Sequence, residues 1–176
     1  MPPESEIPEA PSPSEDSLIT VVIVARECEP LQISTTLDSL MTQSLGSKAM
    51  SVVVVNVNPA DQTISDYLDG LGKIEHYRSM SIEVLSFPHE IDQTGARRYG
   101  LQHRKSRYVL FLNPGDHLDR EFLKKSLMAL STEPHAGWVY PARLETPPRN
   151  RFISPEPFSP LRMFFRPCLA PGSLYR

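Results

Sequence analysis

The chain has 176 residues, of which 40% are hydrophobic and 22% are charged, and its formal net charge is −3. This length predicts one folded domain with a sizeable core. The acidic balance argues against binding a nucleic-acid polymer, because neutralising phosphates requires a basic face. The longest apolar runs, 52–55 and 108–112, are far too short to cross a bilayer, so we expect no transmembrane segment.

The two cysteines, Cys28 and Cys168, are too few for a disulfide framework and favour a reducing compartment. The first residues, MPPESEIPEA, carry acids where a signal peptide carries bases and an apolar stretch. We therefore expect a cytoplasmic protein, and peripheral association with the inner face of a membrane stays open. The sequence does not indicate an oligomeric state.

Proline divides the chain into three regions. Of the 18 prolines, five lie before Ser17 and nine lie from Pro134 onward. Proline removes a backbone donor and interrupts helices and central strands. We predict a disordered Pro/Glu/Ser-rich head over 1–16, a regular domain over 17–140 and an irregular Pro-rich tail over 141–176.

The elements of the regular domain follow from apolar periodicity. Runs of β-branched residues without polar alternation predict strands covered on both faces, and apolar residues at helical spacing predict helices. Asp119 is a good N-cap for the last helix. In chain order we expect strand 18–25, helix 31–43, strand 50–57, helix 64–71, strand 81–87, helix 94–104, strand 107–112, helix 120–130 and a short strand over 137–140.

Strands and helices therefore alternate at least four times, which predicts an α/β, Rossmann-like, mostly parallel sheet flanked by helices. Ligands of such sheets bind beyond the carboxyl ends of the strands. The loops of interest are 26–30, 56–63, 88–93 and 113–118.

The loop after the fourth strand, Asn113-Pro114-Gly115-Asp116-His117, places a carboxylate at the ligand edge of the sheet. Carboxylates suit a hard divalent cation, which in turn can bind a diphosphate. Taken alone, this motif favours a turn in which Asp116 makes a local cap, because aspartate is common in turns.

Other loops offer weaker signals. Asn56 has the hydrogen-bonding groups to contact a base or a ribose, whereas Asp61 is better explained as the N-cap of the following helix. Arg97, near a helix start, is equally consistent with an anion site and a solvated face, and Arg98 favours the solvated face. Neither a G-x-G-x-x-G motif nor a P-loop is present, and Cys28 lacks identifiable partners for a nucleophilic role.

Four segments in order resemble family 2 glycosyltransferases, which have the GT-A fold. The stretch 21–45 resembles the first strand, turn and helix of that family, which ends in a Ser-Leu…Gln pattern. The stretch 56–63 (NVNPADQT) stands where the family has an Asp-Asp-Gly-Ser-x-Asp-x-Thr turn. The stretches 96–100 (ARRYG) and 108–116 (YVLFLNPGD) stand in place of Gly-x-x-x-Ala-Arg-Asn-x-Gly and Tyr-x-x-Phe-Leu-Asp-x-Asp-Asp.

This resemblance implies a domain that binds a nucleotide-diphospho-sugar together with Mg²⁺ or Mn²⁺. Asp116 takes the place of the metal-binding aspartate, and Asn113 replaces the first aspartate of the same motif. Asn56 replaces the aspartate that reads the base. The remaining residues expected to line the donor pocket are Arg26, Glu27, Asp61 and Arg97.

In the resembled family a carboxylate base deprotonates an acceptor hydroxyl, which displaces the nucleotide in one inverting step. The acceptor here would be a sugar or a lipid-linked molecule. The family's Glu-Asp base motif follows a segment resembling PCLAPGSLYR, after which this sequence stops at Arg176. Glu145 and Glu156 are the carboxylates after Glu133, and neither has motif support, so the catalytic base is unknown.

Two other interpretations compete with a transferase. One is a truncated or degenerate relative that binds a nucleotide-sugar or a partner without catalysing transfer, which the missing base motif favours. The other is a receiver-like signalling domain, with Glu27 and Glu29 as its acidic cluster. It ranks low because Phe87-Pro88-His89, instead of a phospho-accepting aspartate, follows the third strand.

Overall fold

The computed structural model describes residues 17–87, 91–103, 106–145, 148–154 and 172–176, so the predicted head lies outside the described residues. Every strand and helix predicted from the sequence is present, with bounds that differ by at most two residues. The strands of the regular domain are β1 (Ile19–Ala25), β2 (Met50–Asn56), β3 (Ser81–Ser86), β4 (Tyr108–Leu112) and β5 (Trp138–Val139). The helices are α1 (Pro30–Met41), α2 (Gln62–Gly70), α3 (Gln93–Gln102) and α4 (Phe122–Thr132), with short 3₁₀ turns η1 (Ser47–Ala49), η2 (Leu71–Lys73) and η3 (Glu75–Tyr77).

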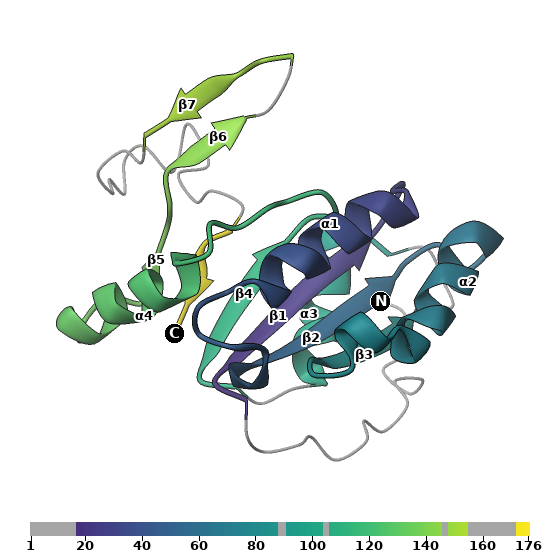
Figure 1. Cartoon of the computed structure of the whole chain (residues 1–176), viewed down its shortest axis with the longest axis horizontal. Helices are drawn as coiled ribbons and strands as arrows, with labels where there is room; N and C mark the ends of the chain where they lie inside the picture. Colours follow the sequence, from purple (N-terminus) through teal and green to yellow (C-terminus); the bar gives the residue numbers. More distant parts are fainter. Residues whose placement is uncertain (1–16, 88–90, 104–105, 146–147, 155–171) are drawn as a thin grey trace, which may run out of the picture.

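The main sheet has the order β3-β2-β1-β4-β8-β5, and its first four strands are parallel. The order β3-β2-β1-β4 is that of a dinucleotide-binding Rossmann sheet, whereas receiver-like domains have the order 2-1-3-4-5. The receiver-like interpretation is therefore wrong, and the predicted α/β Rossmann-like class is confirmed. Figure 1 shows the sheet with its helices on both faces.

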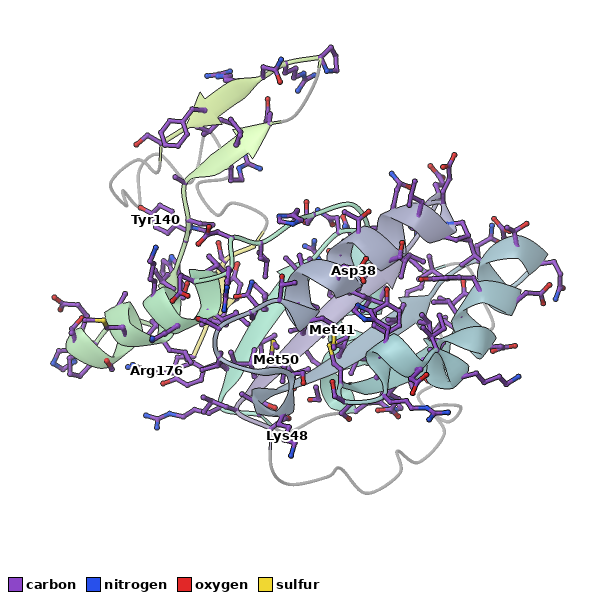
Figure 2. The ribbon with its side chains drawn as sticks, in the orientation of Figure 1. Asp38, Met41, Lys48, Met50, Tyr140 and Arg176 are labelled. Atoms are coloured by element: carbon purple, nitrogen blue, oxygen red, sulfur yellow. The ribbon has the colours of Figure 1, made fainter. Side chains whose placement is uncertain are left out.

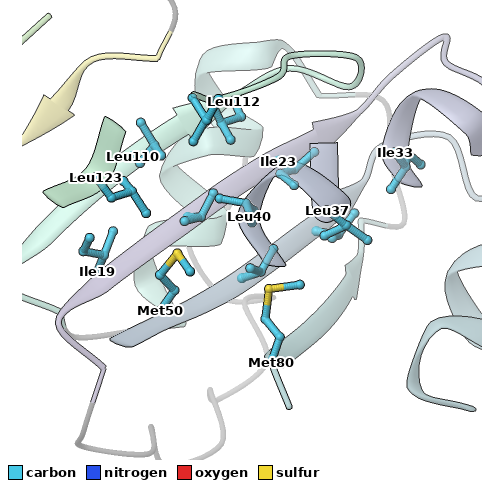
Figure 3. Packing of buried hydrophobic residues seen from close by; sticks show 14 of the residues in the cluster. Ile19, Ile23, Ile33, Leu37, Leu40, Met50, Met80, Leu110, Leu112 and Leu123 are labelled. Carbon is cyan, nitrogen blue, oxygen red and sulfur yellow. The ribbon is translucent and has the colours of Figure 1, made fainter. Parts of the chain in front are cut away.

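One face of the sheet is covered by α1, α2 and α4. The side chains of Ile33, Leu37 and Leu40 on α1 are fully buried against β1, β2 and β4. Figure 3 shows these residues packed over the strand residues of the same cluster, with Leu123 of α4 beside them. Because β1 and β2 are buried along their whole length, their sequences carry no polar alternation.

The opposite face is covered by α3, which packs on β1 and β2 through Ala96, Tyr99 and Gly100. A Cβ atom at Gly100 would lie 2.8 Å from Cγ1 of Val22 and 3.1 Å from Cγ2 of Val55. This helix therefore approaches the sheet more closely than a side chain at residue 100 would allow.

A buried glutamine joins the ends of α1 and α4. Gln43 is 4% exposed, and its Nε2 donates to the carbonyl oxygens of Ser39 (3.1 Å) and Asp119 (2.8 Å). Its Oε1 accepts from the backbone N–H of Leu123 at 3.2 Å. Gln43 thus satisfies an N–H in the first turn of α4, where no intrahelical partner exists.

Helix α4 begins two residues later than the sequence predicts. The Oδ1 of Asp119 accepts from the N–H of Glu121 at 3.1 Å, and the N–H of Phe122 donates to the carbonyl of Asp119 at 2.9 Å. Asp119 therefore closes the turn that precedes the helix, and Glu121 occupies the N-cap position.

The region after residue 140 contains structure that the sequence did not predict. Strands β6 (Arg143–Glu145) and β7 (Arg151–Ile153) form an antiparallel hairpin, which stands apart from the main sheet in Figure 1. Strand β8 (Leu174–Tyr175) inserts between β4 and β5 and is antiparallel to both. Arg176 then donates from its guanidinium to the carbonyl oxygens of Leu130 and Pro134, beside the end of α4 (Figure 2).

Candidate functional site

The candidate site is built around the turn that follows β4. The N–H of Asn113 donates to Oδ2 of Asp116 at 2.7 Å, and the N–H of Asp116 donates to the carbonyl of Asn113 at 3.0 Å. The turn bends at Gly115, which has a φ of +90°. Asp116 thus caps its own turn, as the simplest interpretation of the motif predicts, and this cap fixes the direction of its carboxyl group.

Helix α1 holds this turn in place. The N–H of Gly115 donates to the carbonyl of Gln32 at 2.9 Å and lies 3.0 Å from Oγ1 of Thr36, which accepts from it. The hydroxyl of Thr36 lies 3.3 Å from the carbonyl oxygen of Asn113. The position of Asp116 therefore depends on packing between α1 and the end of β4.

Arg97 of α3 reaches the same turn from another element. Its guanidinium donates to Oδ1 of Asn113 at 3.3 Å and lies 5.4 Å from the centre of the Phe111 ring. The Nε2 of Gln93 donates to the same Oδ1 at 2.9 Å. The structure therefore brings together three of the predicted site residues, Arg97, Asn113 and Asp116.

Burial and the neighbouring polar groups shift the pKa of Asp116 in opposite directions. Partial burial raises the pKa of its carboxyl group above the ordinary value, which is the largest effect. The hydrogen bond from Asn113 and the charges of Arg143 and Arg97 lower the pKa and offset part of this rise. Asp116 is a half-buried acid whose raised pKa is lowered in part by the charges of Arg143 and Arg97.

The side chains around the turn after β4 supply only part of the ligands that a metal ion needs. Among the described residues no group of three or more His, Cys, Asp or Glu side chains could hold a metal ion. Asp116 offers one carboxylate, with one oxygen already accepting from Asn113. Mg²⁺ is commonly bound through one or two carboxylates together with substrate phosphates, so this residue fits a metal that arrives with a diphosphate.

The loop after β1 holds Arg26 and Glu27. The guanidinium of Arg26 donates to the carbonyl of Ile91, which links the end of β1 to the segment before α3. Glu27 is exposed and has a φ of +45°, an uncommon conformation for a residue with a side chain. Both residues lie at the edge of the sheet that is predicted to bind a ligand. Their roles in ligand binding stay predictions.

The loop after β2 is held by its own polar residues. Asn56 is 2% exposed; its Oδ1 accepts from the N–H of Asn58 at 3.0 Å and its Nδ2 donates to Oγ of Ser65 at 3.2 Å. Oδ1 of Asp61 accepts from the N–H groups of Thr63 (3.1 Å) and Ile64 (3.3 Å) at the start of α2. The predicted N-cap role of Asp61 is confirmed.

The other residues considered in the sequence analysis have surroundings that do not indicate a chemical role. Burial, and secondarily the charge of Asp61, raises the pKa of the Cys28 thiol, so the reactive thiolate is disfavoured. Arg98 and His117 are exposed, while Ala96 and Tyr99 pack inward. Cys168 and Glu156 lie outside the described residues.

Three residues of the site were not predicted from the sequence. Thr36 belongs to a segment predicted as helical and Gln93 to the predicted loop 88–93, and their contacts with the turn after β4 depend on how α1 and α3 pack. Arg143, whose charge lowers the pKa of Asp116, lies in the predicted irregular tail, where no sequence pattern indicates this effect.

Comparison with solved structures confirms the fold. The chain is similar to S. aureus TarS 1–349 in complex with UDP-GlcNAc, with a TM-score of 0.65 and 21% identity over 90% of this chain and 45% of that one. It is also similar to the mannosyltransferase PcManGT from Pyrobaculum calidifontis, in complex with GDP-Man and Mn²⁺. There the TM-score is 0.58, with 18% identity over 74% of this chain and 37% of that one.

The chain therefore spans less than half the length of these solved structures. Neither a protein-family model nor a curated protein matches the sequence. None of the described helices combines the length and the apolar character needed to cross a membrane.

Proposed function

We propose that this chain is the nucleotide-sugar-binding part of a GT-A glycosyltransferase that resembles family 2. The observation that carries the proposal is the meeting of Asp116, Asn113 and Arg97 beyond the carboxyl end of β4. This is the edge where Rossmann-like sheets bind their ligands. The similar folds of TarS with UDP-GlcNAc and PcManGT with GDP-Man and Mn²⁺ support the same substrate class.

In the proposed site Asp116 holds Mg²⁺ or Mn²⁺ together with the diphosphate of the donor. When bound, such an ion neutralises the charge that develops on the leaving diphosphate. Arg97 adds a fixed positive charge, because Asn113 and the Phe111 ring orient its guanidinium. Binding of the metal should depend on the nucleotide, since the protein supplies a single carboxylate.

The loops after β1 and β2 form the proposed nucleotide pocket. Arg26 and Glu27 border it from the first strand, and Asn56 and Asp61 shape its other side. Because Asn56 is buried and bonded to Asn58 and Ser65, we propose that it fixes the loop that faces the base. Asp61 acts in the same way through its cap of α2.

The proposed reaction is transfer of the sugar to an acceptor hydroxyl, of a sugar or of a lipid-linked molecule. A carboxylate base removes the hydroxyl proton while the oxygen attacks the anomeric carbon and the nucleotide diphosphate leaves, with inversion. The base is unassigned in this chain. We therefore retain the alternative of a module that binds the nucleotide-sugar without transferring it.

The donor class is tested by thermal unfolding with UDP-, GDP- and dTDP-sugars, each with and without Mn²⁺. We expect one nucleotide to raise Tm in the presence of Mn²⁺, because a ligand that binds the folded state alone stabilises it by mass action. Asp116→Ala should abolish the metal-dependent shift, whereas Asp69→Ala, an exposed acid on α2, should preserve it. A chain whose Tm responds to none of these donors would contradict the proposed function.

Transfer is tested separately with a radiolabelled form of the donor that binds. Release of the labelled sugar to an acceptor or to water indicates a transferase. Binding without any release indicates the non-catalytic module.

A further inference from the structure

The side-chain amide of Asn113 is oriented by two residues of α3. Its Oδ1 accepts from Nε2 of Gln93 at 2.9 Å and from the guanidinium of Arg97 at 3.3 Å. Because a guanidinium carries only donors, the side-chain oxygen of Asn113, and not its amide nitrogen, faces α3. The N–H groups on Nδ2 of Asn113 are therefore turned away from α3 and are left for a different partner.

The shorter of these two hydrogen bonds comes from Gln93, the exposed first residue of α3. The start of this helix is capped by Asp92, whose side chain accepts from the N–H of Gly95. The helix packs on the sheet through other residues, Ala96 and Tyr99 among them. Gln93 thus takes no part in the cap or in the packing of α3, and its printed contact is with the turn after β4.

The orientation of this amide matters because of its neighbours. The backbone N–H of Asn113 donates to Oδ2 of Asp116 at 2.7 Å, so the amide belongs to the same turn as the proposed metal ligand. Arg97 meets a neutral amide here, whereas a carboxylate at this position would neutralise its charge. An N–H₂ group beside an uncompensated guanidinium is suited to an acceptor atom that carries negative charge, and a phosphoryl oxygen is such an acceptor.

We infer that Gln93 is a positioning residue, which holds the Asn113 amide so that Nδ2 donates to a phosphoryl oxygen of the nucleotide-sugar. This inference rests on the proposed function. It assigns a role to a residue outside the four segments that resemble family 2 glycosyltransferases, and Gln93 itself acts on the ligand only through Asn113. The other explanation is that Gln93 simply joins α3 to the turn after β4.

Isothermal titration in Mg²⁺ measures the effect, with UDP, GDP or dTDP, whichever binds the wild-type protein. Gln93→Leu removes one of two donors to Oδ1 of Asn113, and we expect Kd to rise about threefold. Gln93→Glu offers only acceptors and should attract Nδ2, which turns the amide round, so we expect a rise of about 10- to 30-fold. Gln102→Leu and Gln102→Glu, at an exposed residue in the last turn of α3, are the matched controls and should leave Kd within about 1.5-fold.

A double-mutant cycle separates positioning of the amide from a purely structural link. In Asn113→Asp both ends of the side chain are oxygens, so it no longer matters which end faces α3. We expect Gln93→Leu to raise Kd about threefold in the wild-type background and less than about 1.5-fold in the Asn113→Asp background. An equal rise in both backgrounds would show that Gln93 acts on the turn as a whole and would overturn the inference.

The side-chain amide of Asn113 gives a direct measurement that does not depend on the affinity of the double variant. Its N–H₂ resonances are identified by their absence from the proton–nitrogen correlation spectrum of Asn113→Asp. We expect a saturating nucleoside diphosphate to shift these resonances in the wild type and to shift them much less in Gln93→Leu, while Tm of the two unliganded proteins agrees within about 1 °C. The same shift in both proteins, or none in the wild type, would overturn the inference; a wild-type chain that binds none of the three diphosphates would instead overturn the proposed function.

Discussion

The two faces of the sheet are covered in different ways. On one face, α1, α2 and α4 bury large aliphatic side chains, and Gln43 joins two of these helices through three hydrogen bonds. On the other face, α3 packs through Ala96, Tyr99 and Gly100 on four valines of β1 and β2, with Val57 beyond the end of β2. The first layer packs on the larger of the two hydrophobic clusters, whereas the second layer carries Arg97 and Gln93 to the turn after β4. Helix α3 thus brings polar side chains to the turn after β4, while α1 of the first layer holds the backbone of the same turn.

The largest expected effect comes from Gln43→Leu on the first face. The substitution leaves the N–H of Leu123 and the carbonyl of Asp119 without their side-chain partner, and each such group costs about 1–3 kcal/mol. We expect a loss of about 3 kcal/mol in the free energy of unfolding, measured in urea. Gln62→Leu, which removes an exposed hydrogen bond to Asp66, should change it by less than about 0.5 kcal/mol. Similar losses in the two variants would show that Gln43 does not join the helices.

A smaller loss of stability, with a larger effect on binding, is expected from Gly100→Ala on the second face. The new Cβ would contact Val22 and Val55, and overpacking of this kind costs about 1–3 kcal/mol. Gly70→Ala, where a Cβ meets nothing within 4 Å, should be neutral or stabilising. Because α3 must move away from the sheet, Gly100→Ala should also weaken donor binding at temperatures where the protein is folded. Donor affinity equal to that of the wild type would break the proposed link between α3 and the site.

The smallest effect concerns Asp116, in the turn that contacts Thr36 of one layer and Gln93 and Arg97 of the other. Because burial raises its pKa, its favourable contribution is present below the ordinary pKa of about 3.9 and is lost as pH rises through the raised value. At pH 7 the ionised carboxyl therefore costs stability, and Asp116→Asn should raise the free energy of unfolding by less than about 1 kcal/mol. This difference should shrink as the pH is lowered toward 4, as followed by urea unfolding at both pH values. A less stable Asn variant at pH 7 would show that Arg97 and Arg143 outweigh burial.

Much of the fold could be predicted because its signals are local. The unbroken β-branched runs of β1 and β2 indicate burial on both faces, and Asp61 begins α2 as its cap predicts. Strand β8 could not be predicted, because it is defined by pairing of Leu174 with Leu110, far away in the sequence. Short strands of this kind are specified by tertiary packing and not by their own sequence.

The candidate site was predictable in part for the same reason. The turn after β4 has the composition of a turn, so the position of Asp116 at the sheet edge follows from its neighbours in sequence. The contribution of Arg143 depends on a hairpin between two proline-rich stretches, for which the sequence carries no periodic signal. For Asn56 the sequence identifies the location after β2. It does not show that the side-chain amide is hydrogen-bonded to Asn58 and Ser65 within the protein.

The placement of β8 has a consequence for biosynthesis. Strand β5 pairs with β8 and is separated by it from β4, so Trp138 and Val139 can join the sheet only after residue 175 has left the ribosome. The four parallel strands and α1 to α4 are complete long before that point. During translation the nascent domain therefore exposes the free edge of β4, whose unpaired N–H and C=O groups are a template for pairing with another chain. Chaperone contact at this edge would protect the nascent chain until β8 is inserted.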